Sequence, residues 1–470
     1  MTAPLWTIDA LATAAAGTLD GVVADAITGF SIDTRSLGAG DVFVALKDQR
    51  DGHDFVSAAF KAGAVAALVS HAYVRQAGDG ALIRVDDPLR ALERIGIAAR
   101  ARLSPDARVF AVTGSVGKTG TKEMLQACLG RVGKTHAAVK SFNNHWGVPL
   151  TLARTPADVA YAVYEIGMNH AGEITPLTKM VRPHVAIVTT VEPVHLANFA
   201  SIEGIADAKA EIFSGLESGG TAIINRDNPH WDRLCAAALA AGARVVTFGH
   251  HADADVRMIA ADVRADGSRV DLALRHCTVA YDLSAPGAHI VQNSAAVVAA
   301  LDVAGADLDQ ALPALAQASA PEGRGKRTTL AAPGSPILLI DESYNANPAS
   351  MRAALTALGT VPREKFPRRI AVLGDMLELG ATSEALHRGL CPAITAAEID
   401  LVFACGPQMR HLFEAIPVPM RGAWAHDSAA LEDKMLASLE GGCAVMIKGS
   451  LGSRMALLVR ALKDRFPGGT

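Results

Sequence analysis

The sequence predicts an α/β protein of three domains, each built on a sheet with helices packed against it. Its 470 residues exceed what one ordinary hydrophobic core holds. Apolar runs of strand length alternate with helical segments, an order typical of parallel sheets. Half of the residues are hydrophobic, but only 5% are aromatic, so aliphatic side chains must fill the layers between helices and sheets.

The first domain is predicted to span residues 1–105. Residues 41–46 alternate as a strand does, and residues 55–67 have the pattern of a helix that leads into a strand at 66–69. The Ala- and Arg-rich stretch 89–103 predicts a further helix, which ends the domain.

The central domain is predicted at residues 106–319. It opens with the apolar run 108–112, which is followed by a Gly-rich loop and by a helix at 118–129. Further buried strands, separated by helices, are expected at 159–166, 185–190, 221–224 and 245–248. This βαβ order predicts a parallel sheet.

The C-terminal domain is predicted at residues 320–470, starting where Pro321, Gly323 and Gly325 break the pattern. Its strands alternate with helices and are expected at 337–340, 370–373, 401–404 and 444–447. This order resembles a second open, Rossmann-like sheet.

Charge and composition exclude several classes of protein. The net charge is −4 and there is no long run of Lys or Arg, which argues against a nucleic-acid partner. The six cysteines form no Cys-x-x-Cys pair, which fits a reducing compartment. No Lys or Arg precedes Arg35, and apolar stretches such as 283–301 contain Pro, Gly and amides, so neither a signal peptide nor a membrane span is expected. We expect a cytoplasmic protein.

The strongest motif is the loop Thr113-Gly114-Ser115-Val116-Gly117-Lys118-Thr119, between the apolar run and the helix. Its glycines permit a tight turn whose N–H groups face phosphate oxygens, beside the positive end of the helix. Lys118 is expected to reach the outer phosphates, and the Thr119 hydroxyl to bind Mg²⁺. The usual first Gly of such loops is Val112 here, so an ordinary Gly-rich turn is the alternative.

Three further residues are candidate metal ligands. Glu165 ends a strand expected to lie beside the loop strand, where a carboxylate can hold Mg²⁺, although it also fits a solvated strand end. His195 follows another strand, and a lone His is more often structural. Lys209 lies on an apolar-faced helix, whose pattern alone favours a surface lysine. A lysine of depressed pKa can instead react with CO₂ to give an anionic carbamate.

Together these residues resemble the Mur ligases, ATP-dependent enzymes that extend the UDP-linked peptidoglycan precursor. The segments Ser31–Arg35, Gly40–Leu46 and Asp51–Phe55 are similar to the UDP-binding domain of the family. Tyr164-Glu165-Ile-Gly-Met-Asn169 is similar to the family's Mg²⁺ segment, and Asp341-Glu-Ser-Tyr-Asn-Ala-Asn-Pro348 to the members that add a dipeptide.

The resemblance implies a role for each matching residue. Glu165, His195 and a carbamylated Lys209 would join Thr119 in holding two Mg²⁺. Asn293 would contact the adenine, Arg324 the ATP phosphates, and Asp341 or Glu342 the ribose. Precursor and acceptor contacts are implied at Ser31, Arg35, Asn143, Asn144, Tyr344, Asn345 and Lys448.

The implied reaction joins D-alanyl-D-alanine to UDP-N-acetylmuramoyl-tripeptide through an acyl phosphate, with ATP converted to ADP and phosphate. Lys118 and Arg324 would offset the negative charge of the reacting groups. We expect a monomer. Two alternatives are a family member that adds a single amino acid, such as a diamino acid, and a P-loop nucleotide switch.

Overall fold

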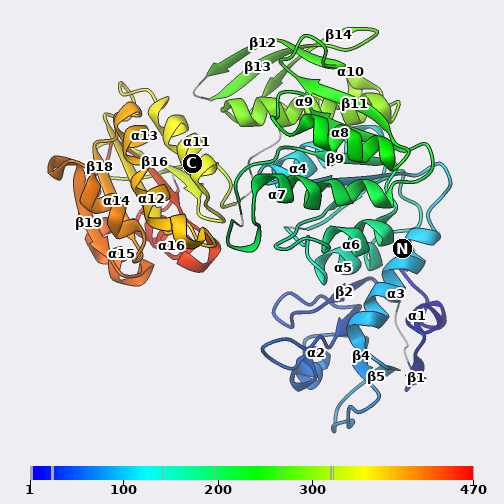
Figure 1. Ribbon diagram of the computed structural model, residues 1–470. Coiled ribbons are helices and arrows are strands. Elements are labelled where there is room, and N and C mark those ends of the chain that lie inside the picture. The colour runs from blue at the N-terminus through cyan, green and yellow to red at the C-terminus, as the bar shows by residue number, and fades with distance from the viewer. Residues whose placement is uncertain are drawn as a thin grey trace.

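The computed structural model describes residues 4–22, 26–139, 141–194, 196–264, 266–317, 320 and 322–468. Within them the strands form three sheets, of five, nine and six strands. Figure 1 shows each sheet with its helices as a separate lobe, the central one lying between the other two. The expected α/β class with three sheet-based domains is confirmed.

The N-terminal domain holds the five-stranded sheet, in the order β1-β5-β4-β3-β2. β1 runs antiparallel to β5, and the other neighbours are parallel. The apolar faces of α1 and α3 cover one side and α2 the other. The elements are α1 (Ile8–Ala15), β1 (Thr18–Asp20), β2 (Gly29–Ser31), β3 (Asp41–Val44), η1 (Gly52–Phe55), α2 (Val56–Lys61), β4 (Ala66–Ser70), β5 (Ala81–Val85) and α3 (Pro88–Ala101).

The helix predicted over 55–67 is wrong at its C-terminal end, because α2 stops at Lys61. Ala62 caps it, and Gly63 follows with φ +107°, a left-handed conformation that favours glycine. The chain turns there and enters β4 at Ala66. Gly63 is therefore the sequence signal for the helix end.

The central domain holds the nine-stranded sheet, in the order β14-β13-β12-β11-β10-β9-β6-β8-β7. Helices α4 and α9 cover one face, and α5, α6, α7 and α8 the other. The strands are β6 (Arg108–Thr113), β7 (Thr135–Ala137), β8 (Tyr161–Glu165), β9 (Val185–Val188), β10 (Thr221–Asn225), β11 (Arg244–Gly249), β12 (Val256–Arg264), β13 (Gly267–Ala273) and β14 (Thr278–Leu283).

The helical segments of this domain are α4 (Lys118–Val132), α5 (Gly147–Ala153), α6 (Ile174–Val181), η2 (Leu196–Asn198), α7 (Ile202–Ala210), η3 (Glu211–Gly215), α8 (Trp231–Ala240), α9 (Ala288–Val303), α10 (Leu308–Ala311) and η4 (Leu312–Ala314). The expected parallel pairing holds from β7 to β12. The last three strands are instead antiparallel neighbours. These exposed strands lack the continuous apolar runs of the buried ones.

The C-terminal domain holds the six-stranded sheet, in the order β15-β16-β20-β17-β18-β19, parallel except for β15. Helices α11, α13 and α14 pack on one face, and α15 and α16 on the other. The strands are β15 (Lys326–Leu330), β16 (Ile337–Glu342), β17 (Arg368–Gly374), β18 (Leu401–Cys405), β19 (Arg421–Ala425) and β20 (Cys443–Lys448). The helical segments are α11 (Pro348–Gly359), η5 (Gly380–Thr382), α12 (Ser383–Arg388), α13 (Cys391–Ala396), α14 (Met409–Ala415), η6 (Val418–Met420), α15 (Ser428–Leu436), η7 (Leu451–Ser453) and α16 (Ala456–Arg465).

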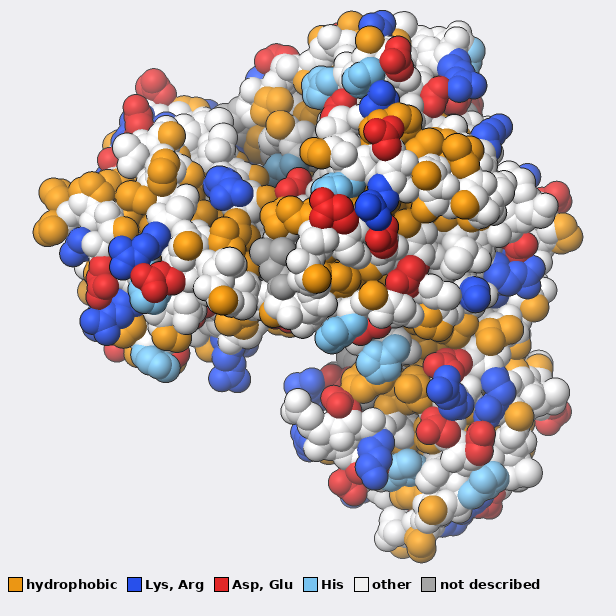
Figure 2. Space-filling view, in the orientation of Figure 1, with side chains coloured by type: hydrophobic (Ala, Val, Ile, Leu, Met, Phe, Trp, Pro, Cys, Tyr) orange, Lys and Arg blue, Asp and Glu red, His pale blue; other side chains and the backbone are white. Residues whose placement is uncertain are grey.

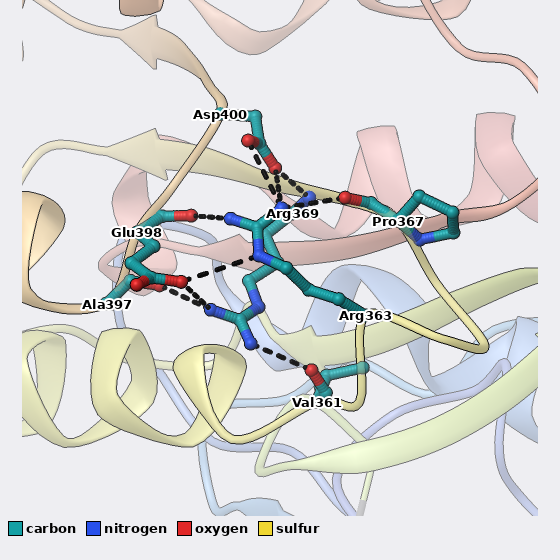
Figure 3. A network of polar contacts seen from close by, with 7 residues as sticks. All are labelled: Val361, Arg363, Pro367, Arg369, Ala397, Glu398 and Asp400. Carbon is teal, nitrogen blue, oxygen red and sulfur yellow. Dashed lines mark hydrogen bonds and ion pairs between the residues drawn. The ribbon is translucent and has the colours of Figure 1, made fainter.

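An arginine network fixes the edge of this sheet at which β17 begins (Figure 3). The buried Arg369 donates to the carbonyls of Ala397 and Val361, each at 3.0 Å. Arg363 donates to the Pro367 carbonyl at 2.7 Å and forms an ion pair with Asp400 at 3.0 Å. The candidate site lies at the opposite end of the strands, where Glu342 ends β16 and Lys448 ends β20.

Candidate active site

The loop between β6 and α4 has the backbone conformation that its glycines predict. Gly114 and Gly117 have φ values of +148° and +86°. A Cβ on Gly114 would lie 1.9 Å from Thr189 Oγ1, and one on Gly117 would lie 2.5 Å from Asn293 Nδ2. Neither position can therefore accept a side chain. Asn293, predicted at the adenine, lies under this loop and also lines the cavity beside it.

The loop is held against the end of β9. The Ser115 hydroxyl donates to the Glu192 carbonyl at 3.0 Å and accepts from the Glu192 N–H at 2.9 Å. Thr189 Oγ1 donates to the carbonyl of Val116 at 2.6 Å. These hydrogen bonds hold the loop in place around the N-terminus of α4.

Lys118 folds back over the loop. Its ammonium donates to the Gly114 carbonyl at 2.7 Å. Burial lowers the pKa of Lys118 and the nearby Arg324 adds to the effect, whereas Glu165 opposes it. A cation within reach of the loop's N–H groups suits a polyanionic ligand such as a phosphate chain.

Oxygen atoms converge beside Lys118. β8 pairs with β6 so that Glu165 lies opposite Val112, which confirms the predicted neighbouring strand. The Thr119 hydroxyl donates to Glu165 Oε2 at 2.7 Å and lies 3.0 Å from Ser141 Oγ. Asn143 Nδ2 donates to Glu165 Oε1 at 2.7 Å.

These groups fit Mg²⁺, which prefers carboxylate and hydroxyl oxygens and keeps part of its shell for water and phosphate. Among the described residues there is no group of three or more His, Cys, Asp or Glu that could hold a metal by themselves. The oxygen cluster therefore suits an ion shared with a phosphate ligand. His195, the predicted histidine ligand, lies outside the described residues.

Lys209 is 2% exposed on α7, so the surface position that its helix pattern favours is wrong. Burial holds its pKa well below the usual value, and the charge of Lys118 lowers it further. Within the described residues its ammonium takes part in no hydrogen bond or ion pair. A buried amine of this kind is easily deprotonated.

The C-terminal domain supplies a second cation and an aromatic ring. Arg324 donates to Ser141 Oγ at 2.8 Å, and its guanidinium carbon lies 4.1 Å from the ring centre of Tyr344. Lys448 pairs with Glu342 at 3.1 Å and donates to the Asn345 carbonyl at 3.0 Å.

Asp341 and Glu342 differ in their surroundings. Asp341 is 5% exposed and accepts from the Gly323 N–H and from both the N–H and the hydroxyl of Ser343. Glu342 instead lines the cavity, paired with Lys448. Of the two acids, only Glu342 lines the cavity.

One cavity of about 970 Å³ joins these parts, with walls from all three domains. Predicted site residues that line it are Ser115, Val116, Gly117, Lys118, Asn143, Asn144, Glu165, Asn293, Arg324, Glu342, Tyr344, Asn345 and Lys448. Thr113, Gly114, Thr119, Lys209 and Asp341 are not among the lining residues. In Figure 2 the N-terminal and C-terminal domains project in different directions, which leaves a wide notch between them.

Ser31 and Arg35 do not join this cavity. The Ser31 hydroxyl donates to the Asp33 carbonyl at 2.9 Å, and the exposed Arg35 pairs with the Asp33 carboxylate at 2.6 Å. The N-terminal domain has a separate cavity of about 690 Å³ at the ends of β3, β4 and β5, with Lys47 and His53 in its wall. A role for Ser31 and Arg35 stays a prediction.

Ser141 is the main residue that the sequence did not single out. Its hydroxyl contacts both Thr119 and Arg324, so it connects the central and C-terminal domains. It lies two residues before Asn143, a predicted site residue, and that neighbourhood was the available signal. Arg90 and Glu93 of α3 also line the cavity, although nothing in their helical pattern indicates it.

The chain matches known proteins along most of its length. The Mur ligase middle domain matches residues 112–301, and the Mur ligase, glutamate ligase domain matches residues 326–451. UDP-N-acetylmuramoyl-tripeptide–D-alanyl-D-alanine ligase of Escherichia coli K12 is 38% identical over 448 residues, 94% of each chain. The enzyme of that name from Bacillus subtilis is 35% identical and covers 81% of this chain and 80% of its own.

Solved structures of other proteins are also similar to this chain. The crystal structure of MurF from Acinetobacter baumannii superposes with a TM-score of 0.82 at 30% identity, covering 98% of this chain and 100% of the other. MurF from Thermotoga maritima, in complex with ADP, has a TM-score of 0.74 at 24% identity, which is a likeness of fold. No helix in the described part of the chain has the length and apolar character that a membrane crossing requires.

Proposed function

Because this chain belongs to the Mur ligase family, we propose that it joins D-alanyl-D-alanine to UDP-N-acetylmuramoyl-tripeptide at the expense of ATP. The observation that carries the proposal is the cavity in which the phosphate loop, the oxygen cluster around Glu165 and the cations Arg324 and Lys448 meet. The products are the UDP-linked pentapeptide, ADP and phosphate.

The chemistry needs positive charge, because the carboxylate of the tripeptide and the γ-phosphate of ATP repel each other. Lys118 and Arg324 offset that charge. The carboxylate oxygen bonds to the γ-phosphorus and ADP leaves, giving an acyl phosphate. The amine of D-alanyl-D-alanine then attacks the acyl carbon, phosphate leaves, and the amine gives up a proton.

We assign nucleotide and substrate contacts to residues that line the cavity. Glu342 is the better candidate for the ribose hydroxyls, since the carboxylate of Asp341 is already used by Gly323 and Ser343. Asn293 lies by the phosphate loop, on the nucleotide side. The precursor enters past Asn143 and Asn144, and the acceptor dipeptide lies near Tyr344, Asn345 and Lys448. Ser31 and Arg35 bind the UDP part.

Two Mg²⁺ ions are assigned to Thr119, Glu165, His195 and a carbamylated Lys209. Bound there, Mg²⁺ supplies charge neutralisation at the phosphates. The carbamate forms when the neutral Lys209 amine attacks CO₂ and loses one proton. The low pKa of Lys209 supports this step, and the resulting anion would relieve its repulsion with Lys118.

The carbamate can be tested apart from activity. Protein equilibrated with bicarbonate labelled with carbon-13 should show one carbamate NMR signal, which Lys209→Ala abolishes. Lys209→Ala should also lose phosphate release, whereas Lys179→Ala, on the exposed side of α6, should not. An active Lys209→Ala variant would exclude the carbamate as a ligand.

We further propose a cytoplasmic location, where ATP and UDP-linked precursors are made, and domain limits at 1–105, 106–319 and 320–470. Phosphate release with the precursor and either D-alanyl-D-alanine or single amino acids tests the substrate. Release with the dipeptide alone is expected. Release with a diamino acid alone would favour the single-residue alternative, and ATP hydrolysis that ignores the precursor would favour a nucleotide switch.

A further inference from the structure

A buried lysine lies one turn beyond the phosphate loop and has no part in the chemistry above. Lys122 is 0% exposed, although its helix α4 begins at the cavity. Its ammonium donates to the Ala138 carbonyl at 2.6 Å and to the Glu123 carboxylate at 2.5 Å. Moving an ammonium out of water is unfavourable, and an apolar side chain of similar length would fill the space without that cost.

These two partners connect Lys122 to the site. Glu123 lines the cavity, so the Lys122 charge offsets a carboxylate beside the phosphate loop. Ala138 directly follows β7, and its N–H donates to the Val163 carbonyl of β8. Lys122 therefore anchors the chain immediately before the segment Ser141–Asn144.

That segment arranges the oxygen cluster. Ser141 contacts Thr119 and Arg324, and Asn143 donates to Glu165. Thr119 and Lys122 are three residues apart on α4 and share a face of the helix. The same helix thus touches the segment at Ser141, through Thr119, and touches the chain just before it, through Lys122.

We propose that Lys122 is a positioning residue that sets Ser141 and Asn143 against Thr119 and Glu165 through its bond to the end of β7. This inference rests on the proposed ligase function. Loss of the bond leaves the loop and the cations in place, but releases the hydroxyl and the amide that orient Glu165. A displacement of about 1 Å in a group that positions the reactants can lower a rate by about a hundredfold.

The test compares Lys122→Met and Lys122→Gln with the wild-type protein and with Lys134→Met. Lys134 lies just before β7 and forms an exposed ion pair with Asp158 at 2.5 Å, so its loss should be nearly neutral. In the Lys122 variants, amide exchange over residues 141–146 should rise several-fold without ligand, and with Lys134→Met it should not. This measurement does not depend on the reaction, so it separates failure of this inference from failure of the proposed function.

Activity adds a double-mutant cycle with Ser141→Ala. We expect Lys122→Met to lower kcat about tenfold or more while the KM for ATP changes less than about threefold. If Lys122 acts through Ser141, Ser141→Ala should lower kcat far less in the Lys122→Met variant than in the wild-type protein. The proposal would be overturned if amide exchange or kcat were unchanged in the Lys122 variants. It would also be overturned if the effects of Lys122→Met and Ser141→Ala on kcat were independent of each other, or if neither Lys122 variant folded.

Discussion

The central domain meets its two neighbours through interfaces of different kinds. Towards the N-terminal domain the contact is a shared core, in which Leu150 and Ala153 of α5 pack among the buried residues of the first sheet. Trp6 is 6% exposed and donates from Nε1 to the Ala153 carbonyl at 2.9 Å. The Arg102 guanidinium lies 3.7 Å from the centre of the Trp6 ring, and Arg154 donates to the Phe30 carbonyl at 2.9 Å.

Towards the C-terminal domain, the described residues make polar contacts. Arg324 donates to Ser141, and the Ala197 N–H donates to the Glu378 carbonyl at 3.3 Å. The two apolar cores of the C-terminal domain contain only residues beyond 329. Figure 1 shows this domain beside the central one.

The difference between the two interfaces indicates different roles for the N-terminal and C-terminal domains. A shared core keeps the N-terminal and central domains in one fixed relation, as binding a long precursor across both requires. A polar contact can be exchanged for ligand contacts at low cost. We therefore expect substitutions at the first interface to lower stability, and those at the second to lower the rate.

The largest effect on the rate is expected from Arg324→Ala. Removing one preorganised donor from a developing charge costs about a hundredfold or more in kcat. The midpoint of thermal unfolding should shift by less than about 1 °C, because Arg324 belongs to no core. Lys326→Ala, two residues away and paired with the exposed Glu322, is the control and should retain activity. A large loss of stability with normal kcat would contradict the comparison.

Trp6→Ala should have the opposite profile. Losing a buried indole costs about 3–5 kcal/mol, so calorimetry should show the first unfolding transition several degrees lower. At 25 °C the folded fraction should keep a kcat near the wild-type value. Trp6→Phe retains most of the ring but not the bond to Ala153, and should lose about 1 kcal/mol. Lower kcat with an unchanged transition would show that this interface serves catalysis.

Much of this arrangement could be predicted from the sequence, and the exceptions share a cause. The phosphate loop and Glu165 could be located because strand, Gly-rich turn and helix are local signals and neighbouring parallel strands end at one edge. The burial of Lys209 and Lys122 could not be predicted, because it depends on what packs over the helix. Helix periodicity predicts a solvent-exposed side chain for any lysine.

The choice between Asp341 and Glu342 was open for a similar reason. Adjacent acids differ in function only through their partners. Asp341 is bonded by Gly323 and by the nearby Ser343, whereas Lys448, the partner of Glu342, lies far away in the sequence. The antiparallel extension β12–β14 was missed because its exposed strands lack continuous apolar runs.

A smaller effect concerns pH inside the central domain, beside the first interface. His136, on β7, has a ring nitrogen 3.1 Å from the Thr151 carbonyl of α5, and burial lowers its pKa to about 4, with Arg154 adding to the effect. The folded state thus resists protonation that the unfolded chain accepts below its pKa of about 6.5. Stability is fully present above that pKa and falls as the pH drops towards 4.

Between pH 7 and pH 5, His136 should account for about 2 kcal/mol of lost unfolding free energy. His136→Gln keeps a donor for Thr151 but cannot be charged, so its denaturant midpoint should depend less on pH. His170→Gln is the control, because His170 is exposed and pairs only with Glu173 in the described structure. Equal pH dependence in the wild type and His136→Gln would show that His136 is free to take up a proton in the folded protein.

The smallest effect is expected at the second interface, where the two acids can be compared directly. Glu342→Gln keeps the shape of the side chain but weakens its bond to a ribose hydroxyl, which should raise the KM for ATP about tenfold, with little change in the unfolding midpoint. Asp341→Asn should instead lower the midpoint, because its carboxylate accepts three hydrogen bonds that hold the turn at Gly323. Phosphate-release kinetics and calorimetry on both variants distinguish the roles. If Asp341→Asn raises the KM and Glu342→Gln does not, the ribose contact belongs to Asp341, and the acid facing the cavity serves only to hold Lys448.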